Sequence, residues 1–498
     1  MTRASRWCVA IVSVVGLLAA SGAAVVAPIT GIERFRHQRV DWKSCGIDDM
    51  DAAGGECGEV RVPLDYADPD GRTLDIAVSR VAAADPRHRR GALLADPGGP
   101  GASGLDTIDL LGDVLAPEVR AQYDLIGMDP RGVGRSGGRT CGWDTGEMIR
   151  SAGVGLDGFL ADTARAARLA MSCLATDPAE LRQFTTRNTA RDMDIVRRVL
   201  GEPALSYYGV SYGTYLGAVF AQLFPDRVDR MVLDSAIDPG RYWTGMVRDW
   251  GAADEAALDD WSGWAAGRDA DYHLGATPEQ VRATVENLVN AVARQPITVD
   301  GFTVDDHWLP FLLHNLLASY RLNEKTADTV AELVAAVGGP AKSARTPWLA
   351  DTLSSMRTYE DSALAFIACG DDPAPEEPAR YWAEIESRRA AQPVFGALAA
   401  DIQPCAFWPR PVEPPTVVRN SVPALIVAAT GDPRTPYSHA VALHRAMPAS
   451  RLVGLDGVRI HMTFRPGLSR CVGDAINGYL AAGALPAADL LCRPDEVR

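Results

Sequence analysis

The sequence Gly209-Val210-Ser211-Tyr212-Gly213 decides the fold of this 498-residue chain. It follows a short apolar run at residues 206–208 and opens a helical pattern that ends at residue 224, before Pro225. The pattern G-x-S-x-G between a buried strand and a helix is typical of a sharp turn that exposes a nucleophilic serine. We therefore predict that Ser211 is a catalytic nucleophile and that the Tyr212 amide, at the helix N-terminus, stabilises an oxyanion.

Short apolar runs on both sides of this motif predict a mainly parallel sheet. Runs of four to seven residues that end in Gly, Asp or Pro suit strands that are buried on both faces. Such runs lie at residues 92–95, 123–127, 206–209, 231–234, 424–430 and 451–455, after two earlier strand patterns at residues 58–64 and 74–82. A helical pattern at residues 190–200 stops at Gly201. This alternation predicts an α/β fold with a mainly parallel sheet flanked by helices.

The alternation breaks between residues 240 and 410, where the chain is rich in Trp and mostly helical in pattern. Thr277-Pro278-Glu279-Gln280 is typical of a capping box that opens a helix. Asp300-Gly301, flanked by apolar residues, predicts a hairpin. We expect residues 240–410 to form a large helical cap, inserted before the last strands of a core made of residues 28–239 and 411–498.

A glycine-rich loop, Asp96-Pro97-Gly98-Gly99-Pro100-Gly101-Ala102-Ser103-Gly104, directly follows the third predicted strand. Acyl transfer needs a second backbone N–H for the oxyanion, and this loop is where a strand-based serine site supplies it. We predict that the amide of Gly99 is that second donor. A tight turn without a catalytic role is the alternative.

A nucleophilic serine needs a base, and the base needs an orienting acid, in the chain order Ser, Asp or Glu, His. His461 lies in the loop after the last strand of the predicted core, and Asp432 follows the strand before it. We predict His461 as the base and Asp432 as the acid. Asp234 is the alternative acid, with a structural role favoured. The other histidines after Ser211 are expected in the cap (His273, His307, His314) or on a helix surface (His439, His444).

Composition and charge exclude several functions. The formal net charge is −15 and no long run of Lys or Arg is present, which argues against nucleic acid as a partner. No CxxC, HExxH or Cys/His cluster has the spacing of a metal site, and no phosphate-binding fingerprint occurs. We therefore expect neither a metal nor another cofactor.

The N-terminal residues predict export from the cytoplasm. Arg3 and Arg6 precede an apolar stretch and then the small residues 21–24, which is the layout of a secretory signal. We expect residues 1–27 to be a signal peptide, with an uncleaved N-terminal anchor as the alternative. The protein would then be secreted or associated with the cell envelope.

Eight of the nine cysteines lie after this segment, an even number that suits disulfides in an oxidising compartment. Eight cysteines allow 105 connectivities. The simplest hypothesis joins nearest neighbours in the sequence: Cys45–Cys57, Cys141–Cys173, Cys369–Cys405 and Cys471–Cys492.

The chain contains four longer motifs: Gly98-Gly99-Pro100-Gly101, Asp129-Pro130-Arg131-Gly132-Val133-Gly134-Arg135-Ser136, Gly209-Val210-Ser211-Tyr212-Gly213-Thr214-Tyr215-Leu216-Gly217 and Gly431-Asp432-Pro433-Arg434-Thr435-Pro436. Together they resemble the secreted tripeptidyl aminopeptidases of actinobacteria, which are relatives of prolyl aminopeptidase within the α/β-hydrolases. The resemblance covers nearly the whole mature chain and implies the same triad, Ser211, Asp432 and His461. Two positions depart from the family: Ile460 precedes His461 where the family usually has Gly, and Asp96 opens the glycine loop where relatives often have Asn.

The resemblance implies an exported serine hydrolase that releases short peptides from peptide N-termini through an acyl-enzyme on Ser211. Such an enzyme must neutralise the α-ammonium of its substrate, and acidic residues crowd the Trp-rich part of the cap, although each of them taken singly also suits a solvated helix face. They are Asp249, Asp254, Glu255, Asp259 and Asp260.

Two alternatives to an aminopeptidase stay open at this point. A carboxylesterase or lipase would use the same triad on esters. A catalytically inactive cell-surface protein could retain the fold without the activity. Peptides are the expected partners, and the sequence leaves the oligomeric state open.

Overall fold

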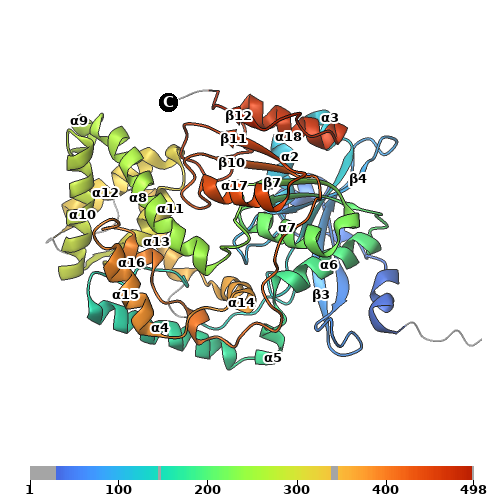
Figure 1. Ribbon diagram of the computed structural model, residues 1–498, viewed down its shortest axis with the longest axis horizontal. Helices are drawn as coiled ribbons and strands as arrows, with labels where there is room; N and C mark the ends of the chain where they lie inside the picture. Colours follow the sequence, from blue (N-terminus) through green and yellow to red (C-terminus); the bar gives the residue numbers. More distant parts are fainter. Residues whose placement is uncertain (1–29, 144–146, 338–345, 496–498) are drawn as a thin grey trace, which may run out of the picture.

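The computed structural model describes residues 30–143, 147–337 and 346–495 and is built around one large sheet (Figure 1). The strand order is β1-β2-β3-β5-β4-β6-β7-β10-β11-β12; β1, β2, β3 and β5 pair antiparallel, and all pairs from β5 onward are parallel. The predicted α/β-hydrolase fold is confirmed. The strands are β1 (Lys43–Ser44), β2 (Glu56–Pro63), β3 (Thr73–Val81), β4 (Gly91–Asp96), β5 (Tyr123–Met128), β6 (Leu205–Val210), β7 (Val228–Asp234), β10 (Leu425–Ala429), β11 (Arg451–Leu455) and β12 (Leu490–Cys492).

Helices cover both faces of this sheet, which is why the central strands are apolar without alternation. Along β10, Ile426 and Ala428 belong to one core cluster, while Leu425, Val427 and Ala429 belong to the other. The first face is covered by α6 (Thr186–Val199), α7 (Tyr212–Leu223) and α17 (Tyr437–Ala446), and the second by α2 (Thr107–Val114), α3 (Pro117–Arg120) and α18 (Arg470–Ala482).

The chain between β7 and β10 forms a layer of helices beside the sheet, and none of its described strands joins the large sheet. Figure 1 shows these helices gathered at the left of the view, with the sheet at the right. They are α8 (Thr244–Ala266), α9 (Asp269–Tyr272), α10 (Pro278–Arg294), α11 (Trp308–Leu316), α12 (Asn323–Ala336), α13 (Pro347–Thr358), α14 (Ser362–Asp371), α15 (Pro378–Arg388) and α16 (Gly396–Ala399), with the 3-10 turns η3 (Tyr320–Leu322) and η4 (Pro404–Phe407).

Two local predictions for this segment are confirmed. The Thr277 hydroxyl accepts the N–H of Gln280 at 3.3 Å and caps the start of α10. The hairpin consists of β8 (Ile297–Val299) and β9 (Phe302–Val304), with Asp300 and Gly301 at positive φ in the turn.

A second excursion from the core joins this helical layer. The chain between β5 and β6 contains α4 (Leu156–Leu174) and α5 (Pro178–Leu181), and α4 packs against α15 and η4. Figure 1 shows α4 running along the lower edge of the cap, next to α15. The remaining elements are η1 (Gly31–His37), α1 (Asp48–Ala52) and η2 (Pro225–Arg227).

The structure contains four disulfides, each within one of these parts, and they are the four pairs expected from the sequence: Cys45–Cys57, Cys141–Cys173, Cys369–Cys405 and Cys471–Cys492. The predicted signal segment lies outside the described residues. In the part of the chain that is described, no helix combines the length and the apolar character that a membrane span requires.

Candidate active site

Ser211 sits in a strained turn between β6 and α7, as the sequence motif predicts. Its backbone has φ 54° and ψ −119°, in the left-handed region that L-residues rarely adopt. Gly209 permits the turn, because a Cβ there would lie 2.4 Å from the carbonyl oxygen of Gly213. The Ser211 N–H donates to the Asp234 carbonyl at 3.0 Å, which ties the strained residue to β7.

His461 and Asp432 are brought together by the ends of β11 and β10. His461 Nδ1 lies 2.8 Å from Asp432 Oδ2, which leaves Nε2 for another partner. The carboxylate is buried and also accepts the N–H of Arg434 at 2.8 Å, the N–H of Thr435 at 3.1 Å and the Thr435 hydroxyl at 3.0 Å. These bonds fix the carboxylate and hence the orientation of the imidazole.

Asp234, the alternative acid, holds the backbone of the His461 loop. Its buried carboxylate accepts the N–H of Thr463 at 3.0 Å, the N–H of Phe464 at 2.9 Å and the Thr463 hydroxyl at 2.7 Å. The structure therefore gives Asp234 the structural role that the sequence favours.

The His461 loop is also bonded to the cap. The His461 N–H donates to Ala318 at 2.9 Å, and the Tyr320 N–H donates to Arg459 at 2.7 Å. Arg459 donates to Asp260 at 2.8 Å and to the Leu317 carbonyl at 2.6 Å. Ile460, the departure from the family pattern, is 1% exposed and packs in the core beneath this contact. An apolar side chain is thus accommodated because the cap covers the loop.

The glycine-rich loop lies directly against the serine turn. Gly98 has φ 98°, and a Cβ there would lie 2.5 Å from the Val210 carbonyl oxygen and 3.1 Å from the Tyr212 nitrogen. Gly99 lines the same cavity as Ser211. The loop thus lies against the turn of Ser211 and Tyr212, and the assignment of the Gly99 and Tyr212 amides as oxyanion donors stays a prediction.

Asp96 fixes the start of this loop through its side chain. Its carboxylate accepts the Gly98 N–H at 2.9 Å. Burial raises the pKa of Asp96 to about 7, because no cation in the described residues offsets the loss of water around it.

Ser211 and His461 open into a cavity of about 590 Å³ between the core and the cap. Its walls are largely apolar, with Trp243, Trp250 and Phe311 from the cap. Glu147 and Asp361 are the two acids among the described residues that line it.

Glu147 and Asp361 form a buried acid pair. Their carboxyl groups are hydrogen-bonded to each other, so the pair shares a proton. Burial and the neighbouring Asp361 carboxyl raise the pKa of Glu147 to about 9, and burial also raises the pKa of Asp361. Such a pair can exchange its proton for a cationic group of a ligand.

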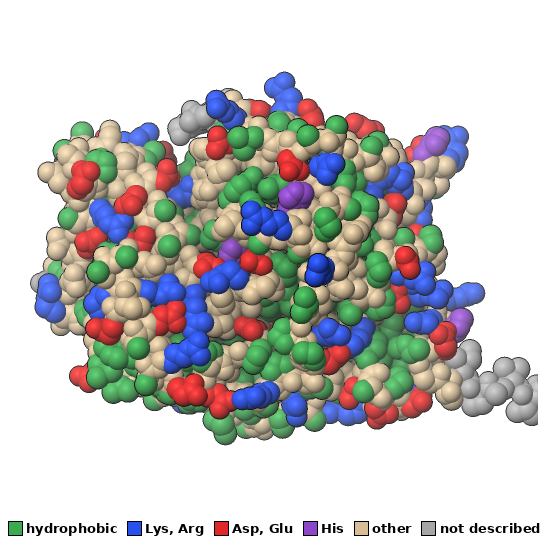
Figure 2. All heavy atoms as spheres, in the orientation of Figure 1, with side chains coloured by type: hydrophobic (Ala, Val, Ile, Leu, Met, Phe, Trp, Pro, Cys, Tyr) green, Lys and Arg blue, Asp and Glu red, His purple; other side chains and the backbone are tan. Residues whose placement is uncertain are grey.

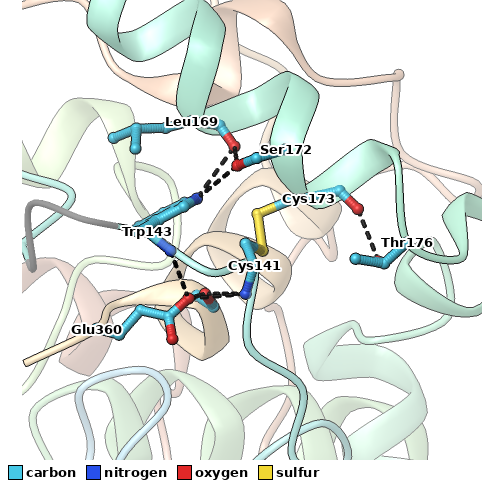
Figure 3. Close-up of a disulfide and its surroundings, with 8 residues drawn as sticks. Cys141, Trp143, Leu169, Ser172, Cys173, Thr176 and Glu360 are labelled. Atoms are coloured by element: carbon cyan, nitrogen blue, oxygen red, sulfur yellow. Dashed lines mark hydrogen bonds between the residues drawn. A yellow bond between two sulfur atoms is a disulfide. The ribbon is translucent and has the colours of Figure 1, made fainter.

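The segment that carries Glu147 is fastened to α4 and to the start of α14. Figure 3 shows the Cys141–Cys173 disulfide joining it to α4, with the Trp143 indole N–H directed at Leu169 and Ser172. Glu360 accepts the N–H groups of Cys141 at 2.7 Å and Trp143 at 3.3 Å.

Two further contacts fix the acid pair itself. The Met148 N–H donates to Asp361 Oδ2 at 2.9 Å. Arg165 of α4 donates to the Glu147 carbonyl. The position of the acid pair therefore depends on contacts between distant parts of the chain.

None of the five cap acids expected to bind a substrate amine lines this cavity, which corrects that expectation. They are paired elsewhere: Asp249 with Arg241 and His439, Asp254 with His314, Glu255 and Asp259 with Arg282, and Asp260 with Arg459. Their partners lie in the cap, in α17 and in the His461 loop, outside the cavity.

The expectation that His439 lies on a helix surface is wrong. His439 is 2% exposed, and its Nε2 lies 2.9 Å from Asp249 Oδ2, because the first turn of α17 packs beneath α8. His444 is half-buried, and His273, His307 and His314 lie in the cap as expected.

Sequence reasoning missed Glu147, Asp361 and Arg434 as cavity residues. Glu147 belongs to neither a strand nor a helix, and Asp361 precedes α14 without any motif around it. Arg434 stands two residues after Asp432, so its closeness to the predicted acid was the one available signal.

Comparisons with known proteins agree with this geometry. A family model described as alpha/beta hydrolase fold matches residues 92–277, and one described as TAP-like protein matches residues 392–492. The tripeptidyl aminopeptidase of Streptomyces coelicolor is 35% identical, over 95% of this chain and 89% of its own length. Two proteins of Mycobacterium tuberculosis are also similar: serine protease Hip1 (28% identical, 91% of each chain) and carboxylesterase B (29% identical, 95% of this chain and 92% of its own).

Proposed function

This chain belongs to the family of the tripeptidyl aminopeptidases, serine peptidases with the α/β-hydrolase fold, and we propose that it releases short peptides from the N-termini of its substrates through an acyl-enzyme on Ser211. The observation that carries the proposal is the buried pair of Glu147 and Asp361 in the same cavity as Ser211 and His461. Carboxyl groups are costly to bury, and recognition of a substrate amine gives these two a role beside the catalytic residues.

The chemistry follows the order of a serine hydrolase. Ser211 Oγ attacks the scissile carbonyl while His461 Nε2 takes its proton, and Asp432 stabilises the imidazolium. The amides of Gly99 and Tyr212 donate to the oxyanion. His461 then returns the proton to the leaving amine, and water hydrolyses the acyl-enzyme in a second round. The 2.8 Å bond between His461 and Asp432 and the strained backbone of Ser211 support these roles.

The acid pair receives the α-ammonium of the substrate. On binding, the ammonium takes the place of the shared proton, which is released to solvent, and the low polarity of the cavity strengthens the attraction between the ammonium and the two carboxylates. The distance between the acid pair and Ser211 then sets how many residues are released. We assign to this pair the role that was expected, from the sequence, for the acids of α8.

A carboxylesterase is the second candidate, since one relative has that name and the cavity walls are largely apolar. Esters need the triad and the oxyanion donors but no amine site. The two candidates therefore differ in one measurable property, the dependence of the rate on a free α-amine.

The test compares a tripeptidyl coumarylamide with a free N-terminus, its N-acetylated form and p-nitrophenyl butyrate. We expect acetylation to reduce kcat/KM by about 100-fold, the loss of a charge-assisted interaction in a partly desolvated site. Glu147→Gln and Asp361→Asn should reduce cleavage of the free peptide to a similar degree and change ester hydrolysis less than about threefold.

Asp259→Asn is the matched control, because Asp259 is 64% exposed and lies outside the cavity. This variant should behave like the wild type on all three substrates. Equal cleavage of free and acetylated peptides would instead identify an endopeptidase or esterase.

We further propose that the protein works outside the cytoplasm, secreted or held at the cell envelope. Four disulfides support this location, because such bonds persist in oxidising compartments. Fractionation of the producing cells with an antibody checks it: the protein should be absent from the cytoplasmic fraction.

A further inference from the structure

The guanidinium of Arg434 places a positive charge in the catalytic cavity, and no described carboxylate is bonded to this group. It follows Asp432 and Pro433 after β10, and its guanidinium turns toward α11 in the cap. There it donates to His314 Nε2 and, at 2.6 Å, to Asn315 Oδ1. Within the described residues, no ion pair joins it to a carboxylate. Buried Arg131, by contrast, is bonded at 2.6 and 2.8 Å to Asp192.

The two residues next to the guanidinium in the cap, His314 and Asp254, carry no negative charge that would neutralise Arg434. His314 is buried and bonded to Asp254 at 2.7 Å. Burial and the charge of Arg434 lower the pKa of His314 well below its usual range, so the imidazole is neutral. Burial raises the pKa of Asp254 well above its usual range. Arg434, which stays protonated at neutral pH, is therefore supported by neutral acceptors.

The cavity as a whole has the opposite charge balance to the protein. Three arginines line it, Arg321, Arg434 and Arg465, against the two acids that share a proton. The chain overall has 64 acidic and 49 basic residues. On the face shown in Figure 2, red and blue side chains are interspersed without a large patch of one sign. The excess of positive charge is thus a local property of the substrate site.

Arg434 also lies near the groups that the proposed function assigns to the two ends of the released peptide. It is close enough to Glu147 for each to affect the pKa of the other, and it stands two residues from Asp432. A peptide with its ammonium at the acid pair and its scissile carbonyl at Ser211 must pass this guanidinium. Two of the five N–H donors of the guanidinium are used by His314 and Asn315, so the others can reach a ligand.

We propose that Arg434 is a specificity-determining residue that binds an acidic side chain within the released peptide, so that substrates with Asp or Glu near their N-terminus are preferred. This inference rests on the proposed aminopeptidase function and adds a substrate class to it. A carboxylate completes the hydrogen bonding of a guanidinium, whereas a neutral amide of the same shape leaves the buried cation unpaired.

The first experiment measures kcat/KM for Ala-Ala-Ala-coumarylamide derivatives that carry Glu or Gln at each of the three positions in turn. We expect the wild type to prefer Glu over Gln by about 10- to 100-fold at one position. Arg434→Gln should reduce that preference to less than about threefold and retain cleavage of the Gln peptide. Equal rates for Glu and Gln at all positions in the wild type, or a preference that Arg434→Gln retains, would overturn the proposal.

Arg268→Gln is the matched control. Arg434 lies over the ring of Trp250 at 5.8 Å, and Arg268 likewise lies over the ring of Trp264 at 4.2 Å, but Arg268 is exposed and outside the cavity. It should keep the full preference for Glu. Hydrolysis of p-nitrophenyl butyrate and the melting temperature report whether Arg434→Gln is folded. If it is not, Arg434→Lys, which keeps the charge but not the planar fork, should show a reduced preference.

Two further experiments test whether another carboxylate binds Arg434 and whether the result depends on peptide cleavage. Longer peptides with a free or amidated C-terminus test the other carboxylate that could reach Arg434; an effect of amidation that Arg434→Gln abolishes, without any effect of Glu, overturns the proposal. Inhibition of ester hydrolysis by Ala-Glu-Ala-type and Ala-Gln-Ala-type peptides needs no peptide cleavage. Stronger inhibition by the Glu peptides would support the binding of an acidic side chain by Arg434 even if the chain cleaved no peptide. Equal inhibition by the Glu and Gln peptides would count against that binding.

Discussion

The two sides of the catalytic cavity are built by different means. On the core side, Ser211, Asp432 and His461 each follow a strand in the parallel part of one sheet, and their positions are set by the backbone. On the cap side, Glu147 and Asp361 follow no strand and are held by a disulfide, by Glu360 and by Arg165.

This difference separates bond cleavage from recognition. The core supplies what any acyl transfer needs, and the cap supplies what a particular substrate needs. Changes in the core should therefore affect peptides and esters alike, and changes in the cap should affect peptides selectively.

Removal of the nucleophile should have the largest effect and should not distinguish the substrates. We expect Ser211→Ala to reduce kcat by about 10⁴-fold or more on both peptide and ester, because no other group can form the acyl-enzyme. Loss of labelling by a fluorophosphonate probe, with an unchanged melting temperature, checks the assignment. Near-native activity of the purified variant would contradict it.

The contact between the His461 loop and the cap tests whether the two sides are independent. Arg459→Met removes the bonds to Asp260 and Leu317 that support this loop. We expect kcat to fall about tenfold on both substrates, because the base is displaced while the acid pair is not. Arg445→Met, at an exposed position of α17, is the control and should be neutral. A loss confined to peptides would mean that the cap contact serves binding.

The Cys141–Cys173 disulfide offers the converse test on the cap side. A double Cys→Ser variant frees the segment that carries Glu147, so kcat/KM for a free-amine peptide should fall about tenfold while ester hydrolysis changes less than twofold. Stability should also fall by about 2–4 kcal/mol, measured by urea unfolding. The Cys45–Cys57 double variant is the control, since it should lose stability without a change in the ratio of peptide to ester hydrolysis. The same loss of ratio in both variants would contradict a role for Cys141–Cys173 in recognition.

A change at Asp96 should have the smallest effect on hydrolysis. Its effect on stability should depend on pH. The folded-state pKa of Asp96, about 7, lies above the usual value of about 3.9, so the folded state binds the proton more tightly. The stability that this proton contributes is present below about pH 4 and lost as the pH rises toward 7, by roughly 4 kcal/mol at most.

Asp96→Asn should remove this dependence. The variant should melt at the same temperature as the wild type at pH 4 and higher than the wild type at pH 8, with hydrolysis changed by no more than a few-fold. If the melting temperatures of the two proteins changed with pH in the same way between pH 4 and pH 8, Asp96 would not be the buried group that titrates.

Elements that are encoded locally were predictable. The predicted strands coincide with β2 to β7, β10 and β11 to within three residues at each end, because runs that are apolar on both faces have few other possible structures. The serine turn was predictable because its close backbone contacts exclude a side chain at positions 209 and 213, so both must be Gly. The nearest-neighbour disulfides were correct because short loops bring each pair of cysteines together.

Elements that depend on contacts between distant segments were not predictable. The acids of α8 are numerous in the sequence, but each finds a basic partner or a histidine in the folded chain. Ile460 departs from the family pattern, and only the cap residues above it explain why the loop accepts it.

The sequence by itself determined the chemistry of this protein: an α/β sheet, a serine turn, an acid and a base in a fixed order, and four disulfides. Only the tertiary structure decided which charged groups line the cavity beside Ser211. The physical reason is that a strand end and a glycine turn are fixed by neighbours in the chain. A buried acid pair and a cation without a bound carboxylate exist only where α4, α11 and α14 meet the core.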